Sequence, residues 1–146
     1  MRIIYVYKIT HVKTSRYYYG CHMTNNLSDG YAGSSRVLKE IYKENPDDAF
    51  IFEFIDFFTN SYEAAVKEYE LIKKFIKQKK CLNKQCFLKF KSYNGFARPE
   101  LLKTFKNKLC NKKFTFLAKN INSAAMLHTQ LANELRYSLS KIHSHW

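Results

Sequence analysis

The chain has 146 residues and a formal net charge of +13, and 46% of its residues are hydrophobic. This is enough apolar material for the core of one domain, alone or with a small appendage. No apolar run reaches the roughly 18 residues that span a bilayer, and a predicted strand follows Met1 and Arg2 directly, without a secretory signal pattern. We therefore expect a cytoplasmic protein that is neither secreted nor held in a membrane.

Two aromatic segments, residues 3–9 and 16–22, predict a β-hairpin, because both are rich in β-branched and aromatic residues and a polar turn separates them. Alternation along the strands places Tyr7 on one face of the first strand, and Tyr18 and Gly20 on one face of the second. The hairpin therefore presents two phenols side by side, next to a glycine that permits close approach.

A polar loop at 23–33 precedes a helix that is predicted from about residue 34 or 35 to residue 45, where Pro46 stops it. Residues 50–58 are apolar on both faces apart from two acids, which is typical of the middle strand of a small sheet. Together these elements predict an α/β (α+β) fold, with a three-stranded, mainly antiparallel sheet flanked by helices.

A second helix is predicted from Asn60, which has Glu63 three residues later in a pattern like a capping box, to about Lys77. On a helical wheel Glu68 falls inside the apolar arc, whereas Glu70 falls on the charged face. A carboxylate in an apolar setting is costly unless it has a cationic partner or a metal. Glu68 is therefore either a metal ligand or half of a salt bridge at the edge of the core.

The positive charge is uneven along the chain. Residues 1–86 carry 14 basic and 10 acidic side chains, whereas residues 87–146 carry 11 and 2. We therefore divide the chain into a module at 1–86 and a basic, mainly helical extension at 87–146, with a short strand at 86–90 and helices at 99–109 and 122–143. A basic stripe with interleaved aromatic residues suits a phosphate backbone, although a solvated lysine-rich surface has the same composition.

The last predicted helix is amphipathic and weakly charged, so packing or homodimerisation is favoured over DNA recognition. A zinc site could be formed from Cys81, Cys86, Cys110 and His128, but the spacing of these residues is loose for such a site. We therefore favour reduced thiols over a zinc site.

The triplets Tyr5-Val6-Tyr7 and Tyr18-Tyr19-Gly20 resemble those of the GIY-YIG nuclease family, with the tyrosine spacing kept and Tyr5 in place of the first glycine. The downstream order also fits: a basic helix, an apolar strand, a helix with Glu68, and then Asn83. The resemblance covers about residues 3–85. It implies that the two tyrosines line the scissile phosphate, that Glu68 binds Mg²⁺ or Mn²⁺, and that Asn83 closes the module.

The segment after the second triplet departs from the family pattern, with His22 directly behind the Gly-Cys pair and a Gly-Tyr-Ala-Gly-Ser run at residues 30–34. This looks like a phage-type variant. We assign Arg36 as the catalytic cation, with Lys39 as the alternative, and His22 as an added acid/base or phosphate contact.

Hydrolysis of a phosphodiester bond requires a base for the attacking water and stabilisation of the developing and leaving oxygens, which one carboxylate-held metal with a nearby cation can supply. The resemblance therefore implies a metal-dependent DNA endonuclease of the free-standing, homing-like kind. A degenerate module that only binds DNA or a protein, and an RNA-cleaving enzyme, are the alternatives. The expected DNA contacts are Lys39, Asn83, Lys103, Lys106, Lys112 and Lys113.

Overall fold

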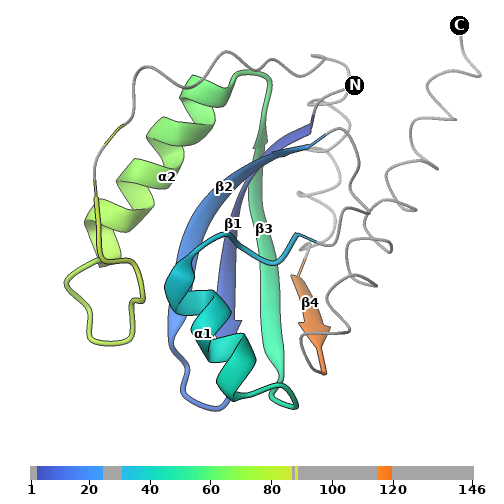
Figure 1. Ribbon diagram of the computed structural model, residues 1–146. Helices are drawn as coiled ribbons and strands as arrows, with labels where there is room; N and C mark the ends of the chain where they lie inside the picture. The colour runs from blue at the N-terminus through green and yellow to red at the C-terminus, as the bar shows by residue number, and fades with distance from the viewer. Residues whose placement is uncertain (1–2, 25–30, 87, 89–114, 120–146) are drawn as a thin grey trace, which may run out of the picture.

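Four antiparallel strands form one sheet in the order β2-β1-β3-β4, with two helices beside it (Figure 1). The computed structural model describes residues 3–24, 31–86, 88 and 115–119. The elements in chain order are β1 (Ile3–His11), β2 (Tyr17–Thr24), α1 (Arg36–Glu44), β3 (Phe50–Phe58), α2 (Ser61–Phe75) and β4 (Thr115–Ala118). The α+β class is confirmed.

The sheet has one more strand than the three that the sequence predicts, because β4 pairs antiparallel with β3. The pairing joins Phe50 to Ala118 and Glu53 to Thr115, so β3 is an inner strand, as its apolar pattern predicts. Four residues of the predicted extension thus belong to the sheet of the module. The helices predicted at 99–109 and 122–143 lie outside the described residues, as does most of the strand predicted at 86–90, of which Cys86 and Leu88 are described without regular secondary structure.

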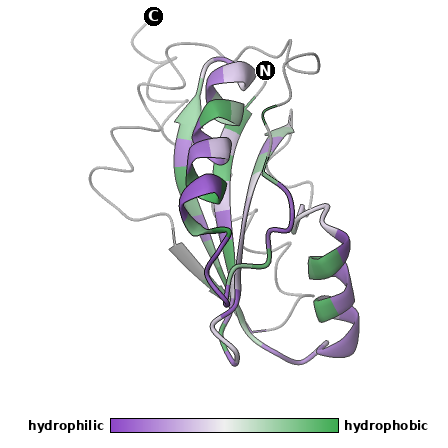
Figure 2. Ribbon diagram, turned by 90° about the vertical axis from the view of Figure 1, so that its left-hand side faces the viewer, coloured by the Kyte–Doolittle hydropathy of each residue, from purple (hydrophilic) through white to green (hydrophobic). Residues whose placement is uncertain are grey.

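The β1–β2 hairpin has the predicted alternation, and each face of β1 packs against a different helix. Tyr5, Tyr7 and Ile9 share a buried cluster with Leu38 and other residues of α1. On the opposite face, Ile4 and Val6 pack with Ala64 and Leu71 of α2. The two helices therefore lie on opposite sides of the strands, and in Figure 2 hydrophobic residues of α1 are turned toward the sheet.

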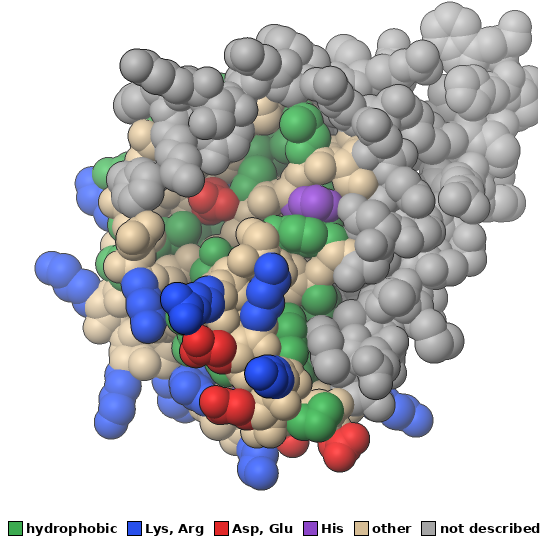
Figure 3. Space-filling model, in the orientation of Figure 1, with side chains coloured by type: hydrophobic (Ala, Val, Ile, Leu, Met, Phe, Trp, Pro, Cys, Tyr) green, Lys and Arg blue, Asp and Glu red, His purple; other side chains and the backbone are tan. Residues whose placement is uncertain are grey.

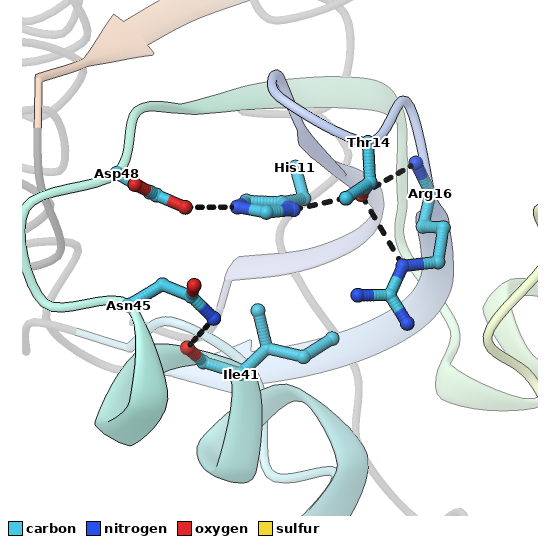
Figure 4. Close-up of polar contacts among 6 residues, drawn as sticks. All are labelled: His11, Thr14, Arg16, Ile41, Asn45 and Asp48. Carbon is cyan, nitrogen blue, oxygen red and sulfur yellow. Dashed lines mark hydrogen bonds and ion pairs between the residues drawn. The ribbon is translucent and has the colours of Figure 1, made fainter.

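The turn of the hairpin is tied to the loop before β3 by His11, which the sequence pattern places in a polar turn. Its side chain is buried, with Nε2 lying 2.8 Å from Asp48 Oδ2 and Nδ1 lying 2.7 Å from Thr14 Oγ1 (Figure 4). Because both ring nitrogens have polar partners, this imidazole is satisfied within the fold. His11 therefore belongs to the scaffold rather than to the candidate site.

Both helices begin and end close to the predicted residues, for identifiable reasons. The Asn60 side-chain oxygen accepts hydrogen bonds from the backbone N–H groups of Tyr62 and Glu63, which caps α2 as predicted. At the end of α1, the Asn45 side-chain amide donates to the Ile41 carbonyl, one residue before Pro46 (Figure 4). The helix α2 stops at Phe75, two residues before the predicted end.

Candidate active site

A pocket of about 400 Å³ lies beside the edge strand β2, where the start of α1, the middle of α2 and the segment after α2 converge. The side chains that line it come from four parts of the chain: Tyr18; Ser35, Arg36 and Val37; Glu68 and Ile72; and Leu82, Asn83, Lys84 and Gln85. Four predicted site residues, Tyr18, Arg36, Glu68 and Asn83, therefore line one pocket. Figure 3 shows the molecule from the side of α1, where basic and acidic side chains are interspersed over this helix.

Glu68 is half-buried on the packed side of α2, between the buried residues Ala65 and Ile72. Its charge is near enough to Tyr18 and to Cys21 to raise the pKa of both, although burial is the larger cause in each case. The pKa of Cys21 rises to about 12, so this neighbour of Glu68 is a neutral thiol rather than a thiolate ligand. Glu68 is the acidic side chain that the pocket offers.

The donor set of the pocket can be compared with the divalent metal that the family resemblance implies. Within the described part of the chain, no three His, Cys, Asp or Glu side chains gather into a metal cluster. Mg²⁺ keeps several waters and commonly binds through one or two carboxylates together with substrate phosphates. A single carboxylate in a pocket that polar and apolar side chains line together fits such an ion, with Glu68 as the residue that would hold it.

Tyr18 stands on the pocket-facing side of the hairpin and is half-buried. Burial is the main cause that raises its pKa; the Glu68 charge and Tyr31 add to it, and a hydrogen bond from the Ser35 side chain acts in the opposite direction. Ser35 occupies the N-cap position of α1, yet its side chain makes no capping hydrogen bond. Tyr18 is therefore a protonated phenol at neutral pH that interacts with the start of α1.

Tyr7 is more deeply placed than Tyr18 and is not among the residues that line the pocket. Its side chain is 5% exposed, and its ring lies on the backbone of Gly20, its partner across the hairpin. A Cβ atom added at Gly20 would lie 2.2 Å from the Tyr7 hydroxyl, so the second triplet needs its glycine here. Burial, followed by Tyr31 and Tyr18, holds the pKa of Tyr7 well above its ordinary value.

Arg36 is the first residue of α1, and its side chain is 94% exposed. Its Nε lies 3.5 Å from the Glu40 carboxylate one turn along the helix, a surface pair of small energetic weight. Lys39 is exposed on the same helix but is not one of the pocket-lining residues. Lys84 does line the pocket, and the sequence pattern did not predict it although it directly follows Asn83.

Asn83 fixes the wall of the pocket to the edge of β2. Before it, the Tyr17 N–H donates to the Lys80 carbonyl and the Leu82 N–H donates to the Tyr17 carbonyl. The side chain of Asn83 then continues this ladder, since Oδ1 accepts from the Tyr19 N–H at 2.9 Å and Nδ2 donates to the Tyr19 carbonyl at 2.8 Å. Asn83 is only 6% exposed, and the DNA contact assigned to it stays a prediction.

His22 and Tyr31 form a stacked pair beside the hairpin. Their ring centroids lie 3.5 Å apart, and the planes differ by 4°. Neither residue is among those that line the pocket. The sequence pattern assigns no role to Tyr31; the one available signal is its place within the glycine-flanked run at residues 30–34.

Several predicted residues cannot be placed in this geometry. The lysines expected to contact DNA in the extension lie outside the described residues, namely Lys103, Lys106, Lys112 and Lys113. The same is true of Cys110 and His128, two of the four residues in the zinc alternative. Cys81 and Cys86 are described and are free thiols.

The fold and pocket define a small α+β module with a pocket at a sheet edge, and known proteins share part of its sequence. The chain is 34% identical over 98 residues to "Putative endonuclease segC" of Enterobacteria phage T4, an alignment that covers 66% of this chain and 48% of segC. It is also 34% identical over 68 residues to "Endonuclease segA" of the same phage, which covers 47% of this chain and 31% of segA. The chain is thus a distant homologue of the T4 seg proteins and spans about half the length of segC.

No protein-family model and no solved structure matches the chain. Among the described residues, no helix has the length and apolar character needed to cross a membrane.

Proposed function

We propose that the chain is a metal-dependent endonuclease of the GIY-YIG type that hydrolyses DNA phosphodiester bonds. The observation that carries this proposal is the convergence of Tyr18, Arg36 and Glu68 on one pocket from three separate elements. The homology to segA and segC, whose names describe endonucleases, supports the same activity. DNA is the proposed substrate, and cleavage of RNA is tested by the same experiment.

The acidic and basic residues of the pocket have distinct roles in the proposed hydrolysis. Glu68 would hold Mg²⁺ or Mn²⁺, which when bound supplies positive charge to the phosphoryl and leaving oxygens. Arg36 and Lys84 line the same space with positive charge, which favours the additional negative charge of the transition state. They also attract the phosphate backbone before any reaction.

The phenol of Tyr18 acts at the attacking or the leaving oxygen. Because its pKa is raised, Tyr18 is a hydrogen-bond donor when the pocket is empty of cations. A nearby cation lowers the pKa of a phenol, and this would convert Tyr18 into a base for the attacking water. His22 lies further from the pocket, and its assignment as an acid/base or phosphate contact stays a prediction.

A second function is favoured by one observation, the position of Arg36. Its guanidinium is almost fully exposed and is paired with Glu40, on the outside of α1. A module without a cation fixed toward the phosphate would bind DNA or a protein without turnover. In that case the protein is a catalytically degenerate binding factor.

The test is a plasmid-nicking assay with Mg²⁺, with a chelator, and with a single-stranded RNA substrate in parallel. We expect Glu68→Ala to abolish DNA cleavage while the circular dichroism spectrum stays native. Glu70→Ala is the matched control, because Glu70 is an exposed acid on the same helix, and it should cleave at nearly the wild-type rate. DNA binding without cleavage by the wild-type protein would favour the binding factor, and equal losses from both variants would refute the role of Glu68.

A further inference from the structure

The hydroxyl group of Tyr7 is hydrogen-bonded to the hydroxyl group of Tyr31. The two hydroxyl oxygens of Tyr7 and Tyr31 lie 3.1 Å apart, and the rings meet edge to face with centroids 5.7 Å apart. The Tyr31 hydroxyl also donates to Ser34 Oγ at 3.4 Å. A chain of three hydroxyl groups thus leads from the hairpin to the residue before Ser35, which lines the pocket.

The surroundings of the Tyr7 hydroxyl are closed on the other sides. The Gly20 backbone lies under the ring, and a Cβ atom added at Gly33 would lie 3.6 Å from the hydroxyl oxygen. The void that Tyr7 and Tyr31 line together measures only about 10 Å³, which holds one water at most. The Tyr7 hydroxyl is therefore oriented by Tyr31 rather than by bulk solvent.

Tyr31 also contacts His22, which the sequence pattern predicts as an acid/base or phosphate contact. The parallel stacking of the two rings restricts the imidazole to one plane. One side chain thus touches two predicted site residues, one through its hydroxyl and the other through its ring.

The hydroxyl of Tyr31 is not needed to fill space, since a phenylalanine would pack in the same way. Tyr42 offers a contrast within the same cluster, because its hydroxyl donates to the Ala32 backbone carbonyl and so has a purely structural partner. The hydroxyls of Tyr7, Tyr31 and Ser34 can each donate or accept. Such a chain can reverse the direction of its hydrogen bonds when a proton moves, which a bond to a carbonyl cannot do.

We propose that Tyr31 is a positioning residue for phosphodiester cleavage, which orients the Tyr7 hydroxyl through a hydrogen bond and holds the His22 ring by stacking. The proposal rests on the proposed endonuclease function. The geometry carries the proposal, since Tyr31 contributes to raising the pKa of Tyr7 and Tyr18 and equally contributes to raising that of Tyr42.

The first experiment is a double-mutant cycle on DNA cleavage. Tyr31→Phe keeps the stacked ring and removes only the hydroxyl, so we expect kcat to fall by about tenfold, as for one lost hydrogen bond, while KM is unchanged. Tyr7→Phe with Tyr31→Phe should be no slower than Tyr7→Phe alone, because the second hydroxyl acts through the first. Tyr42→Phe, the control, should keep the wild-type kcat.

The second experiment needs no cleavage. In protein carrying carbon-13-labelled tyrosine, the isotope shift of the ring carbon next to the hydroxyl reports the exchange of the Tyr7 hydroxyl proton with water. Tyr31→Phe should speed this exchange at least tenfold, whereas Tyr42→Phe should leave it unchanged. An unchanged exchange rate, or a Tyr31→Phe variant with wild-type kcat, overturns the proposal. A wild-type protein that cuts no nucleic acid overturns the endonuclease function instead.

Discussion

Tyr7 ends the first triplet and Tyr18 begins the second, and the fold gives the two tyrosines different surroundings. Tyr7 is enclosed by Gly20, Gly33 and Tyr31, whereas Tyr18 is half-buried and lines the pocket with Glu68. The ring centroids of the two tyrosines lie 6.4 Å apart. We therefore expect Tyr18 to contact the phosphate directly, whereas Tyr7 would act without direct contact from its buried position.

This difference leads to a prediction for two variants that remove only hydroxyl groups. Tyr18→Phe should lower kcat by about 10²–10⁴-fold, the usual contribution of a group that transfers a proton. Tyr7→Phe should lower kcat less, because its hydroxyl does not reach the pocket. Single-turnover cleavage at saturating DNA measures both, and Tyr19→Phe is the control, since Tyr19 lies on the opposite face of β2. Wild-type rates for both variants would mean that the two phenols only pack.

At the scale of elements, the pocket exists because an irregular segment is held against the edge of β2. The backbone of residues 80–82 makes the first two hydrogen bonds of this pairing, and the Asn83 side chain makes the next two. An exposed edge strand is open to pairing with other chains, and this segment covers it. Asn83 therefore shapes the pocket wall and protects the edge of the sheet at the same time.

Asn83→Ala should consequently destabilise the module. The substitution leaves the N–H and carbonyl groups of Tyr19 without these partners, and a buried unsatisfied group costs about 1–3 kcal/mol. We expect the free energy of unfolding, measured by urea titration, to fall by about 2–4 kcal/mol. Lys84→Ala is the control, because Lys84 is the exposed neighbour, and it should change stability by less than about 0.5 kcal/mol. Equal stability of the two variants would show that the side-chain ladder contributes little.

The elements that the sequence predicted correctly are those with a strong local period. The strands of the hairpin, α1, β3 and α2 all repeat their apolar residues at the spacing of a strand or a helix, and the wheel of α2 also singled out Glu68. The strand β4 has only four residues and forms through pairing with β3, more than fifty positions earlier, so no local pattern marks it.

The parts of the site that the sequence did not predict come from loops. Tyr31 and Lys84 lie in segments without a period, and their roles depend on contacts across the fold. Tyr5, which replaces the first glycine of the motif, is explained only by the structure: its ring is fully buried, with Phe54 5.0 Å away between ring centroids. Sequence patterns predict which face of a helix or strand a residue occupies. The contacts that loop side chains make across the molecule become known only from the three-dimensional structure.

For the molecule as a whole, positive charge is distributed unevenly between residues 1–86 and residues 87–146. The catalytic candidates all lie before residue 86, whereas residues 87–146 carry 11 basic and 2 acidic side chains. A second group of exposed lysines lies at the end of α2 and just beyond it, namely Lys73, Lys74, Lys77, Lys79 and Lys80. Under the proposed function, these two groups of lysines are the alternative surfaces for the phosphate backbone of DNA.

The salt dependence of DNA binding decides between these two surfaces. Neutralising Lys103, Lys106, Lys108, Lys112 and Lys113 together should flatten the dependence of log K on log salt, by roughly 0.9 for each phosphate of duplex DNA that the variant no longer neutralises. Affinity should fall alike for all sequences, since interactions with the DNA backbone carry no sequence information. Cleavage at saturating DNA should persist, because the pocket residues are unchanged.

The matched control neutralises the five lysines at the end of α2, which removes the same charge from another surface. If the extension binds DNA, this variant keeps a salt slope close to that of the wild-type protein, because a lower net charge does not by itself change how many phosphates the extension neutralises. The opposite result, an unchanged slope in the extension variant and a flattened slope in the α2 variant, would place the DNA along α2. That path reaches the pocket directly, since Lys84 follows Lys80 by four residues and lines it. Equal flattening in both variants would mean that DNA contacts both surfaces, and the extension would then add affinity without defining the path.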